Sequence, residues 1–384
     1  MLTLITFLVV LSILVFAHEL GHFFVARKLG VKAEEFGFGF PPRAWGFYKN
    51  KEGKWKHIFG AKEVGDASDT IFSINWIPLG GFVKLGEDEE GGSDPNHFSN
   101  KKIWQRASIL SAGVTMNIIL AAILISIGFM LGLPQSLDNL NSAAKISDKK
   151  IQVIDTLPES PAAKAEIKAG DIIVSINNRE FKNQDELQNF VNENNGLELS
   201  YKIKRGPDEI IKKITPITIS ETGRGGIGVG IIETGVVKYP FLIAIWEGIK
   251  ATIFLTWAII EAFYYLFKNL ILGQGVTGDI AGPVGIASLT GQVARMGFIY
   301  VLQFTALLSI NLAIINFLPI PALDGGRVLF LIIEKIKGSP VKREVEAAIH
   351  KIGFALLMVL ILFVTFRDVA KFGDKFKMLW EKIF

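Results

Sequence analysis

Long apolar stretches constrain this chain more than any other feature, because each is long enough to cross a lipid bilayer, which takes about 20 residues of helix. The three clearest run from Leu2 to about Leu29, from about Ala107 to Leu133, and from Met296 to Leu323. The first is uncharged through Ala17, and the third is uncharged throughout. Half of all residues are hydrophobic and the mean hydropathy is +0.38, values typical of an integral membrane protein.

Two further stretches are harder to classify. Ile352 to Phe366 is shorter, but it lengthens if His350 and Lys351 extend their polar ends to the membrane interface. The stretch 241–272 is interrupted by four charged residues: Glu247, Lys250, Glu261 and Lys268. This pattern favours a helix that lies in the interface or leans on the bundle. We therefore predict about four transmembrane helices.

The basic residues predict the orientation. They are concentrated in two loops: Lys32, Arg43, Lys49, Lys51, Lys54, Lys56 and Lys62 after the first span, and Arg327, Lys335, Lys337, Lys342 and Arg343 after the third. With four spans both loops lie on one side, which the positive-inside rule makes cytoplasmic. The N-terminus and the insert 138–240 then lie outside, whereas a crossing at 241–272 would separate the two loops. A signal peptide is disfavoured, because the chain begins without a basic region and no small-residue cleavage site follows.

The composition excludes several kinds of site. The chain has no cysteine, which removes disulfides, thiolate nucleophiles and cysteine-based metal sites. The formal charge of +4 is spread along the chain, so nucleic acid is not expected as a partner. A transition metal would have to be held by histidine, aspartate or glutamate, and the five histidines are at positions 18, 22, 57, 97 and 350.

His18, Glu19 and His22 form the pattern His-Glu-x-x-His at the end of the first apolar stretch. Residues four apart share one face of a helix, so both imidazoles can reach one ion. Glu19 falls beside them, where it could take a proton from water at the metal. Ionisable side chains inside a membrane helix cost at least roughly 2.5–3.5 kcal/mol each, so they persist only with partners or a task. The alternatives are a hydrogen-bonded polar cluster and a proton relay.

Two histidines leave a tetrahedral zinc site one protein ligand short. A candidate is Asp324, in the segment NLAIINFLPIPALDGGRVLF at 311–330. The prolines and glycines of this segment must unwind the helix, and unwound backbone at membrane depth indicates a cavity or a protein contact. Asp324 is equally explained as a turn residue. Asn316 is either an interhelical hydrogen-bonding group or a group that holds substrate backbone.

Two regions are predicted to fold outside the bundle. The insert at about 145–235 alternates apolar and polar residues as strands do. Its segment ESPAAKAEIKAGDIIVSINNREF resembles a bacterial, protease-associated PDZ domain, a module that binds extended peptides or chain ends by strand addition. A generic α+β domain is the alternative. The loop 31–102 has aromatic residues at strand spacing between glycines, so we expect a small sheet against the membrane.

These motifs together resemble the site-2 protease family, and within it the RseP-like bacterial intramembrane zinc metalloproteases. The resemblance rests on HELGH, GFGF, PLGGFVK, the PDZ-like insert and NFLPIPALDGG, which occur in the family's order over nearly the whole chain. It implies roles for seven residues: the zinc ligands His18, His22 and Asp324, the general base Glu19, and the substrate-positioning residues Asn316, Pro319 and Pro321.

The resemblance also assigns Phe36–Phe40 and Pro78–Lys84 to a membrane-associated β-loop that guides the unwound substrate. Further matches to the family lie at Trp104, Arg106, Asn117 and Gly282–Val284. The chain departs from the family in having one PDZ-like unit where the best-known members have two. It also has Val114 where proline is frequent and Phe82 where tyrosine is common, and neither change alters the metal ligands.

We therefore expect a polytopic α-helical membrane protein with a membrane-associated β-loop and an inserted α+β PDZ domain. It would lie in the inner (cytoplasmic) membrane of a bacterium, with the PDZ domain extracytoplasmic. The expected boundaries are 1–30, 103–135, 296–324 and 350–370 for the spans, 31–102 for the β-loop region, 145–235 for the PDZ-like domain, and 240–275 for the membrane-associated helix.

The expected activity is that of a Zn2+-dependent endopeptidase in regulated intramembrane proteolysis. Its partners would be the lipid bilayer and single-pass membrane substrates, such as anti-sigma-factor-like proteins or signal-peptide remnants. Cleavage would occur near the cytoplasmic side after an upstream site-1 protease has removed the outer domain. A membrane metal transporter is an alternative, but it leaves Glu19 and the peptide-binding insert unexplained. An inactive PDZ scaffold leaves the intact Glu19 unexplained.

Overall fold

The computed structural model of the protein describes residues 2–62, 64–86, 96–138, 140–206, 208–220, 223–273 and 281–383. The chain forms two compact units. Unit 1 comprises Met1–Ser126 and Ile245–Phe384, and unit 2 comprises Ile127–Ala244.

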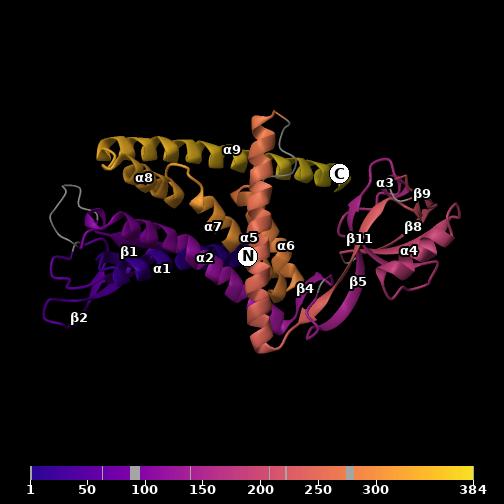
Figure 1. Ribbon diagram of the computed structural model, residues 1–384, viewed down its shortest axis with the longest axis horizontal. Coiled ribbons are helices and arrows are strands. Elements are labelled where there is room, and N and C mark those ends of the chain that lie inside the picture. The colour runs from indigo at the N-terminus through magenta and orange to yellow at the C-terminus, as the bar shows by residue number, and fades with distance from the viewer. Residues whose placement is uncertain are drawn as a thin grey trace. The chain divides into compact units, whose positions relative to one another are not determined.

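Unit 1 is built mainly from helices (Figure 1). The long ones are α1 (Leu2–Lys28), α2 (Ile103–Leu131), α5 (Phe241–Ile271), α7 (Phe298–Phe317) and α9 (Arg343–Ile383). The short ones are η1 (Phe98–Asn100), α6 (Pro283–Met296) and α8 (Asp324–Lys337). Both α2 and α5 continue from one unit into the other.

Five of the described helices are long and apolar enough to cross a membrane: α1, α2, α5, α7 and the Arg343–Ala370 part of α9. The predicted membrane-spanning helices are therefore present, but their predicted number, four, is not established. The difference is α5, whose four charged residues do not break it. It is one continuous helix of 31 residues, about 46 Å long at 1.5 Å per residue.

The third predicted span is interrupted by two breaks. Gly297 separates α6 from α7, and α7 ends at Phe317. The chain then leaves the helical path through residues 318–323, and α8 begins at Asp324. The prolines at 319 and 321 predict this break, because proline lacks a backbone donor and clashes with the preceding helical turn. The break places Asp324 in the first turn of a new helix.

The first loop folds as a three-stranded antiparallel sheet, as its aromatic spacing predicts. Strand β1 (Ala33–Lys49) pairs with β2 (Trp55–Phe59) and with β3 (Ile71–Leu85). Residues 72–74 of β3 pair with both 36–38 and 45–47 of β1, so only the 81–85 end of β3 lies at a sheet edge. The sheet packs on α1 through aromatic rings. Phe36 stacks on Phe23 with 4.7 Å between ring centroids and lies 5.4 Å from Phe16. Burying such a ring contributes about 1.5–3 kcal/mol, which holds the sheet against α1.

Unit 2 has the α+β character predicted for the insert. Its main sheet has the strand order β4-β11-β5-β6-β7-β8, and a separate pair joins β10 and β9. The strands are β4 (Leu133–Ser136), β5 (Lys145–Thr156), β6 (Ile172–Ile176), β7 (Leu199–Arg205), β8 (Asp208–Ile214), β9 (Ile217–Thr218), β10 (Gly225–Gly226) and β11 (Val229–Lys238). The helices are α3 (Pro161–Lys164) and α4 (Gln184–Glu193).

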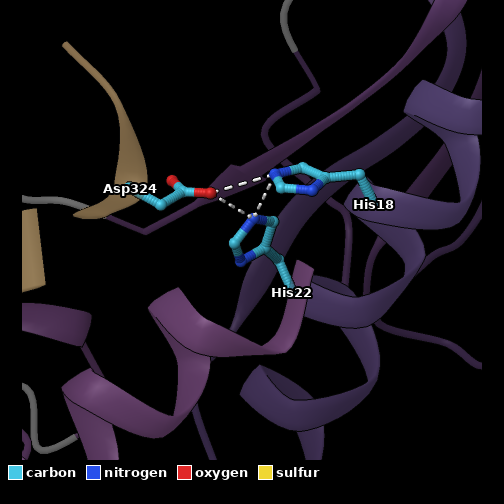
Figure 2. Close-up of side chains that lie close together, drawn as sticks. All are labelled: His18, His22 and Asp324. Carbon is cyan, nitrogen blue, oxygen red and sulfur yellow. Dashed lines mark hydrogen bonds and ion pairs between the residues drawn. The ribbon is translucent and has the colours of Figure 1, made fainter. Parts of the chain in front are cut away.

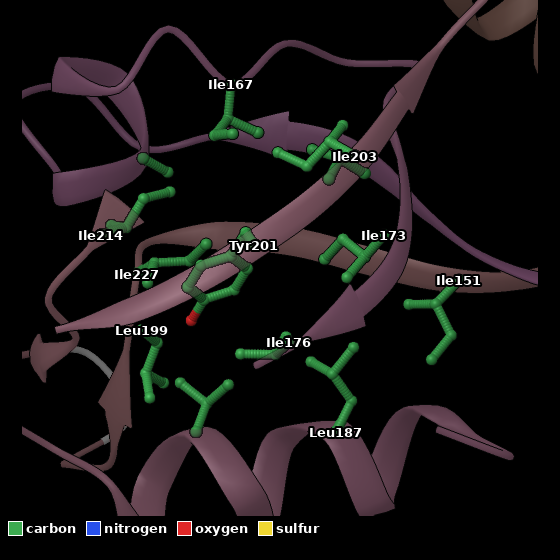
Figure 3. Close-up of a cluster of buried hydrophobic side chains, with 13 residues drawn as sticks. Ile151, Ile167, Ile173, Ile176, Leu187, Leu199, Tyr201, Ile203, Ile214 and Ile227 are labelled. Atoms are coloured by element: carbon green, nitrogen blue, oxygen red, sulfur yellow. The ribbon is translucent and has the colours of Figure 1, made fainter. Parts of the chain in front are cut away.

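The core of unit 2 lies between this sheet and α4 (Figure 3). Alternate residues of β7 from Leu199 to Ile203 are buried, namely Leu199, Tyr201 and Ile203. Leu187 and Val191 of α4 belong to the same cluster. This alternation is the strand pattern that the sequence predicts.

A buried ion pair joins the ends of two strands of unit 2. The carboxylate of Asp171 is almost fully buried and accepts two hydrogen bonds of 2.7 Å from the Arg205 guanidinium and one of 2.9 Å from the N–H of Lys168. Burial raises the pKa of Asp171, but these hydrogen bonds lower it by more, so the carboxyl stays ionised at neutral pH. The pair ties the start of β6 to the end of β7.

Candidate metal centre

Three side chains from distant parts of the sequence converge in unit 1 (Figure 2). His18 and His22 lie one turn apart on α1, so both imidazoles project from the same face. The Nε2 atom of His18 lies 2.9 Å from Oδ2 of Asp324, and that of His22 lies 3.3 Å from the same oxygen. The two Nε2 atoms are 3.2 Å apart. All three potential ligand atoms lie within 4.8 Å of one another, close enough to share one metal ion.

The contacts of His22 fix the ring for metal binding. Its Nδ1 lies 2.8 Å from the carbonyl oxygen of Ile109 on α2, so Nδ1 carries the proton and donates it there. The lone pair of the neutral imidazole is then on Nε2, which faces the cluster. A backbone carbonyl in this role is a common partner of metal-binding histidines. The imidazole is buried, so its orientation is also held by packing.

His18 also has a partner on α2. The amide of Asn117, which is fully buried, lies beside Nδ1 of His18, with Nδ2 at 3.4 Å, and the amide Oδ1 has no hydrogen-bond partner among the described residues. A metal on Nε2 requires a proton on Nδ1, and that proton needs an acceptor. Rotating the amide by 180° would supply Oδ1 as the acceptor. Asn117 can therefore orient His18 in the metal-binding state.

Two glycines allow α1 and α2 to meet at this point. A Cβ on Gly113 of α2 would lie 2.5 Å from Nε2 of His22 and 2.8 Å from Nε2 of His18. A Cβ on Gly21 of α1 would lie 2.3 Å from the carbonyl oxygen of Ala112. Such distances are below van der Waals contact, so neither position has room for a side chain. The α2 backbone forms one wall of the metal centre.

The break between α7 and α8 places Asp324 next to the two histidines. Its side chain is 22% exposed and stands in the first turn of α8, where the helix dipole favours a carboxylate. Gly326 lets the chain return close to itself, because a Cβ there would lie 2.3 Å from the carbonyl oxygen of Ile320. The turn is therefore compact, and its shape decides where the carboxylate points.

Glu19 lies beside this cluster without belonging to it. Its Oε2 accepts a hydrogen bond of 3.2 Å from the N–H of Val83 on strand β3. A cavity of about 210 Å3 is lined by Val15, His18, Glu19, Leu312, Asn316, Ala322, Leu323 and Asp324. A carboxylate that can accept a proton thus shares one cavity with the metal cluster, which is an arrangement suited to hydrolysis.

The predicted site residues are distributed as follows. His18, His22 and Asp324 come together, and Glu19 and Asn316 line the adjoining cavity. Pro319 and Pro321 do not line that cavity; Pro321 instead contacts α9 at Gly353. The sequence interpretation missed the role of Gly113, and it noted Asn117 only as a family match. No spacing relates either residue to the histidines, and the available signal was the run of small residues around Gly113.

A second concave site lies within unit 2. This groove of about 670 Å3 is bordered by α4, through Leu187, Gln188 and Val191, and by the start of β11, through Val229 and Ile231. At Val229–Ile231, β11 pairs with β5 along one edge, and its pairing with β4 begins only at Thr234. An open strand edge beside an apolar helix face is the arrangement that binds an extended peptide by strand addition.

Comparison with known proteins identifies the family. The model of Peptidase family M50 matches residues 6–61 and 58–360. The regulator of sigma-W protease RasP of Bacillus subtilis is 30% identical over 96% of this chain and 98% of its own length. Zinc metalloprotease RasP of Geobacillus kaustophilus is 30% identical with the same coverage. A Clostridium acetobutylicum protein that bears the name zinc metalloprotease is 36% identical over 93% of this chain and 94% of its own length.

Among solved structures, the PDZ domain of an SdrC-like protein from Listeria monocytogenes is 25% identical to this chain. The alignment covers 23% of this chain and 92% of the Listeria domain, with a TM-score of 0.21. The match to the family model extends over most of the chain, and the relatives align almost from end to end. The chain therefore belongs to peptidase family M50, the site-2 protease family, and is a multi-pass membrane zinc metalloendopeptidase.

Proposed function

We propose that His18, His22 and Asp324 hold the zinc ion of this protease and that Glu19 is its general base. The observation that carries the proposal is the convergence of three ligand atoms within 4.8 Å, next to a cavity that Glu19 also lines. Two imidazoles and one carboxylate form a ligand set typical of catalytic zinc, with one position left for the reaction. The buried imidazoles, the bond from His22 to the Ile109 carbonyl and the space at Gly113 fit that ion.

The residues around the cavity have separate tasks in peptide hydrolysis. Zinc supplies Lewis acidity, which polarises the scissile carbonyl and makes water a stronger nucleophile near neutral pH. Glu19 accepts the proton of the attacking water and returns it to the leaving amine. The N–H of Val83 holds the Glu19 carboxylate in place. Asn316 binds the substrate backbone, and Pro319 and Pro321 keep the adjoining chain out of a helix.

The substrate reaches this cavity as an extended chain. A helical backbone is closed to attack by its own hydrogen bonds, so the scissile segment must first unwind. The 81–85 end of β3 lies at the edge of the described sheet, and its Val83 contacts Glu19. A segment that paired with β3 would gain backbone hydrogen bonds and would lie beside the general base. Aromatic packing of the sheet on α1 keeps that edge close to the metal centre.

The proposed substrates are single-pass membrane proteins, cut near the cytoplasmic side in regulated intramembrane proteolysis. The Bacillus subtilis relative is named a regulator of sigma-W. Anti-sigma-factor-like membrane proteins are therefore one proposed substrate class, and signal-peptide remnants are another. The protease acts in the inner membrane of a bacterium, after an upstream site-1 protease has trimmed the substrate.

We further propose four spans, α1, α2, α7 and α9, with unit 2 outside the cell. Contacts within unit 1 support this number. Gly248 near the start of α5 packs on Ser126, about 20 Å along α2 from Gly113 at the metal centre. Gly291 of α6 packs on Thr3, about 22 Å along α1 from His18. Gly248 and Gly291 thus both contact the bundle at the end opposite the metal centre. The chain between them, which includes most of α5, would therefore cross the membrane an even number of times, and a single crossing by α5 does not fit.

The charges of α5 also favour a position in the interface. At 100° per residue, Glu247, Lys250, Glu261 and Lys268 fall within about 60° of one another, while Ala244, Gly248 and Thr252 form the buried side. In a spanning helix this charged stripe would face lipid at a cost of several kcal/mol. Within unit 1, α5 runs across the direction of α1 and α2 (Figure 1). An in-plane helix would place the stripe in water and the aromatic side chains in the headgroup layer.

The absence of native cysteine makes the topology directly testable. Single cysteines at three exposed positions, Lys51→Cys, Glu180→Cys and Lys337→Cys, would be treated in intact cells with a membrane-impermeant thiol reagent. We expect labelling at 180 and protection at 51 and 337, with all three labelled after lysis. Labelling at 337 in intact cells would mean that α5 crosses the membrane.

The groove of unit 2 is proposed to screen substrates, either by size or by binding a newly exposed chain end. Full-length protease in liposomes would receive a single-pass substrate with its folded outer domain or with that domain removed. We expect the trimmed substrate to be cut far faster. Gln188→Trp, which fills the groove from an exposed position, should alter this selection without preventing cleavage of the trimmed protein. Equal cleavage of both substrates by the wild type would rule out screening but leave the protease assignment intact.

A further inference from the structure

The turn that presents Asp324 contains an unusual backbone conformation. Ala322 has a φ of +78°, in the left-handed region that residues other than glycine seldom adopt. Local hydrogen bonds support part of the turn, from Ile320 N–H to the Leu318 oxygen at 2.7 Å and from Leu323 N–H to the Ile320 oxygen at 3.2 Å. A strained residue two positions before Asp324 persists only if its surroundings hold it there.

The contact that holds this residue comes from α9. The N–H of Ala322 donates a hydrogen bond of 2.9 Å to Nδ1 of His350. Three residues further along the same helix face, Gly353 lies directly against the turn, since a Cβ there would stand 2.4 Å from Cβ of Pro321 and 2.8 Å from its oxygen. The ring of His350 also packs on Phe330 of α8, with 5.4 Å between centroids. His350 thus lies between the strained turn and the helix that Asp324 begins.

This part of α9 is a local anchor. Within Arg343–Ala370, the buried residues are Gly353 and Asp368. Asp368 accepts a hydrogen bond of 2.7 Å from the N–H of Gly285 in the first turn of α6, about 22 Å along α9 from Gly353. The other residues of this stretch are partly or fully exposed. The contacts at His350 and Gly353 are therefore local, because this stretch of α9 is not buried along its length. A change at His350 should affect the Ala322 turn more than the packing of α9 as a whole.

The hydrogen bond defines the form of the imidazole. Nδ1 must present its lone pair to Ala322, so the ring proton is on Nε2. The carboxylate of Glu346, one helical turn earlier, has Oε1 at 3.9 Å from Nε2, and its negative charge favours a proton on that side. A side chain that keeps an acceptor at the Nδ1 position would preserve the contact. One that keeps only the bulk of the ring would not.

We propose that His350 is a positioning residue for the metal centre, which holds the Ala322 turn in the conformation that aims Asp324 at His18 and His22. The inference rests on the proposed role of Asp324 as a zinc ligand. Without the acceptor, the strained residue is free to relax toward a common backbone conformation, and the first turn of α8 moves with it. The carboxylate is then displaced from the imidazoles, and zinc is bound less tightly.

The test compares His350→Asn with His350→Leu in the full-length protein in detergent. The Oδ1 of asparagine stands one bond from Cγ, as Nδ1 does, whereas leucine retains volume without an acceptor. Zinc affinity would be measured by competition with a chromogenic chelator. We expect His350→Leu to lose roughly tenfold or more in affinity, as is typical for partners behind metal ligands, and His350→Asn to stay close to the wild type. Lys351→Gln, at the exposed neighbouring position, is the control.

A second comparison separates the hydrogen bond from general packing. Glycine adopts a φ of +78° without strain, so Ala322→Gly should restore most of the zinc affinity to His350→Leu. Thermal unfolding of the zinc-free proteins would verify that each variant is folded, and the His350→Asn comparison still applies if His350→Leu is not. Equal losses in the leucine and asparagine variants, or no loss in either, would overturn the proposal. A wild-type protein that binds no zinc at this centre would instead refute the proposed function.

Discussion

Glu19→Gln is expected to abolish cleavage of a trimmed single-pass substrate while zinc stays bound. Glutamine has the same shape as glutamate, and its Oε1 can still accept the hydrogen bond from the N–H of Val83. The lining of the cavity is therefore expected to stay unchanged. What is lost is the ability to take a proton from water and deliver it to the leaving amine. A positioned general base contributes typically 10²–10⁴-fold to the rate, and we expect a loss of that size.

The measurement pairs single-turnover cleavage in liposomes with metal analysis of the purified protein. Zinc content should equal that of the wild type, because Glu19 lies outside the three-residue cluster. Glu261→Gln, an exposed carboxyl on α5, serves as the matched control and should leave both quantities unchanged. Cleavage at the wild-type rate would remove Glu19 from the mechanism. Loss of zinc together with cleavage would instead make Glu19 part of the metal site.

Local patterns in the sequence predict the parts of the centre that lie within one element. The spacing of His18 and His22 places both imidazoles on one face of a helix, whatever the helix packs against. The prolines at 319 and 321 predict that a helix ends before Asp324, because their effect on the backbone is local. That Asp324 then meets His18 did not follow from either segment alone. The residues alone offer Asp324 as a candidate ligand or as a turn residue, and the family resemblance favours the ligand.

The contribution of α2 could not be predicted in this way. Gly113 and Asn117 act on the imidazoles only because α2 crosses α1 at Gly21, and no periodicity in either helix specifies the crossing point. The same holds for His350, whose role depends on where α9 meets the Ala322 turn. Contacts between distant elements depend on packing, which a single sequence does not encode in its local pattern.

The number of spans illustrates a different limit. Hydropathy and length place α5 among the candidate spans, because both average over the whole circumference of the helix. The angular positions of Glu247, Lys250 and Lys268 contain the missing information, since they lie on one side. That periodicity is present in the sequence, where a count of the charges alone does not reveal it.

Gly113→Ala is expected to lower both zinc affinity and cleavage, because the added methyl group displaces the imidazoles that bind the metal and leaves Glu19 unchanged. The added methyl group would lie 2.5 Å from Nε2 of His22 and 2.7 Å from Cε1 of His18, so at least one imidazole must rotate away. Because Nε2 of His22 is a proposed ligand atom, zinc affinity should fall by roughly 10–100-fold. A displacement of about 1 Å at a reacting centre costs about a hundredfold in rate, so cleavage should fall at least that much.

The two variants are expected to differ in zinc binding. This difference tests whether Glu19 acts as the base while the imidazoles beside Gly113 bind the metal. Glu19→Gln should be inactive with zinc bound, whereas Gly113→Ala should lose zinc and activity together and regain activity as zinc is raised. Alanine favours a helix over glycine by about 1 kcal/mol, which offsets part of the cost of crowding the imidazoles, so thermal unfolding of the zinc-free protein would verify that the variant is folded. Gly65→Ala, where a methyl group meets open space, is the control. Wild-type zinc affinity in Gly113→Ala would mean that the imidazoles bind metal in another arrangement.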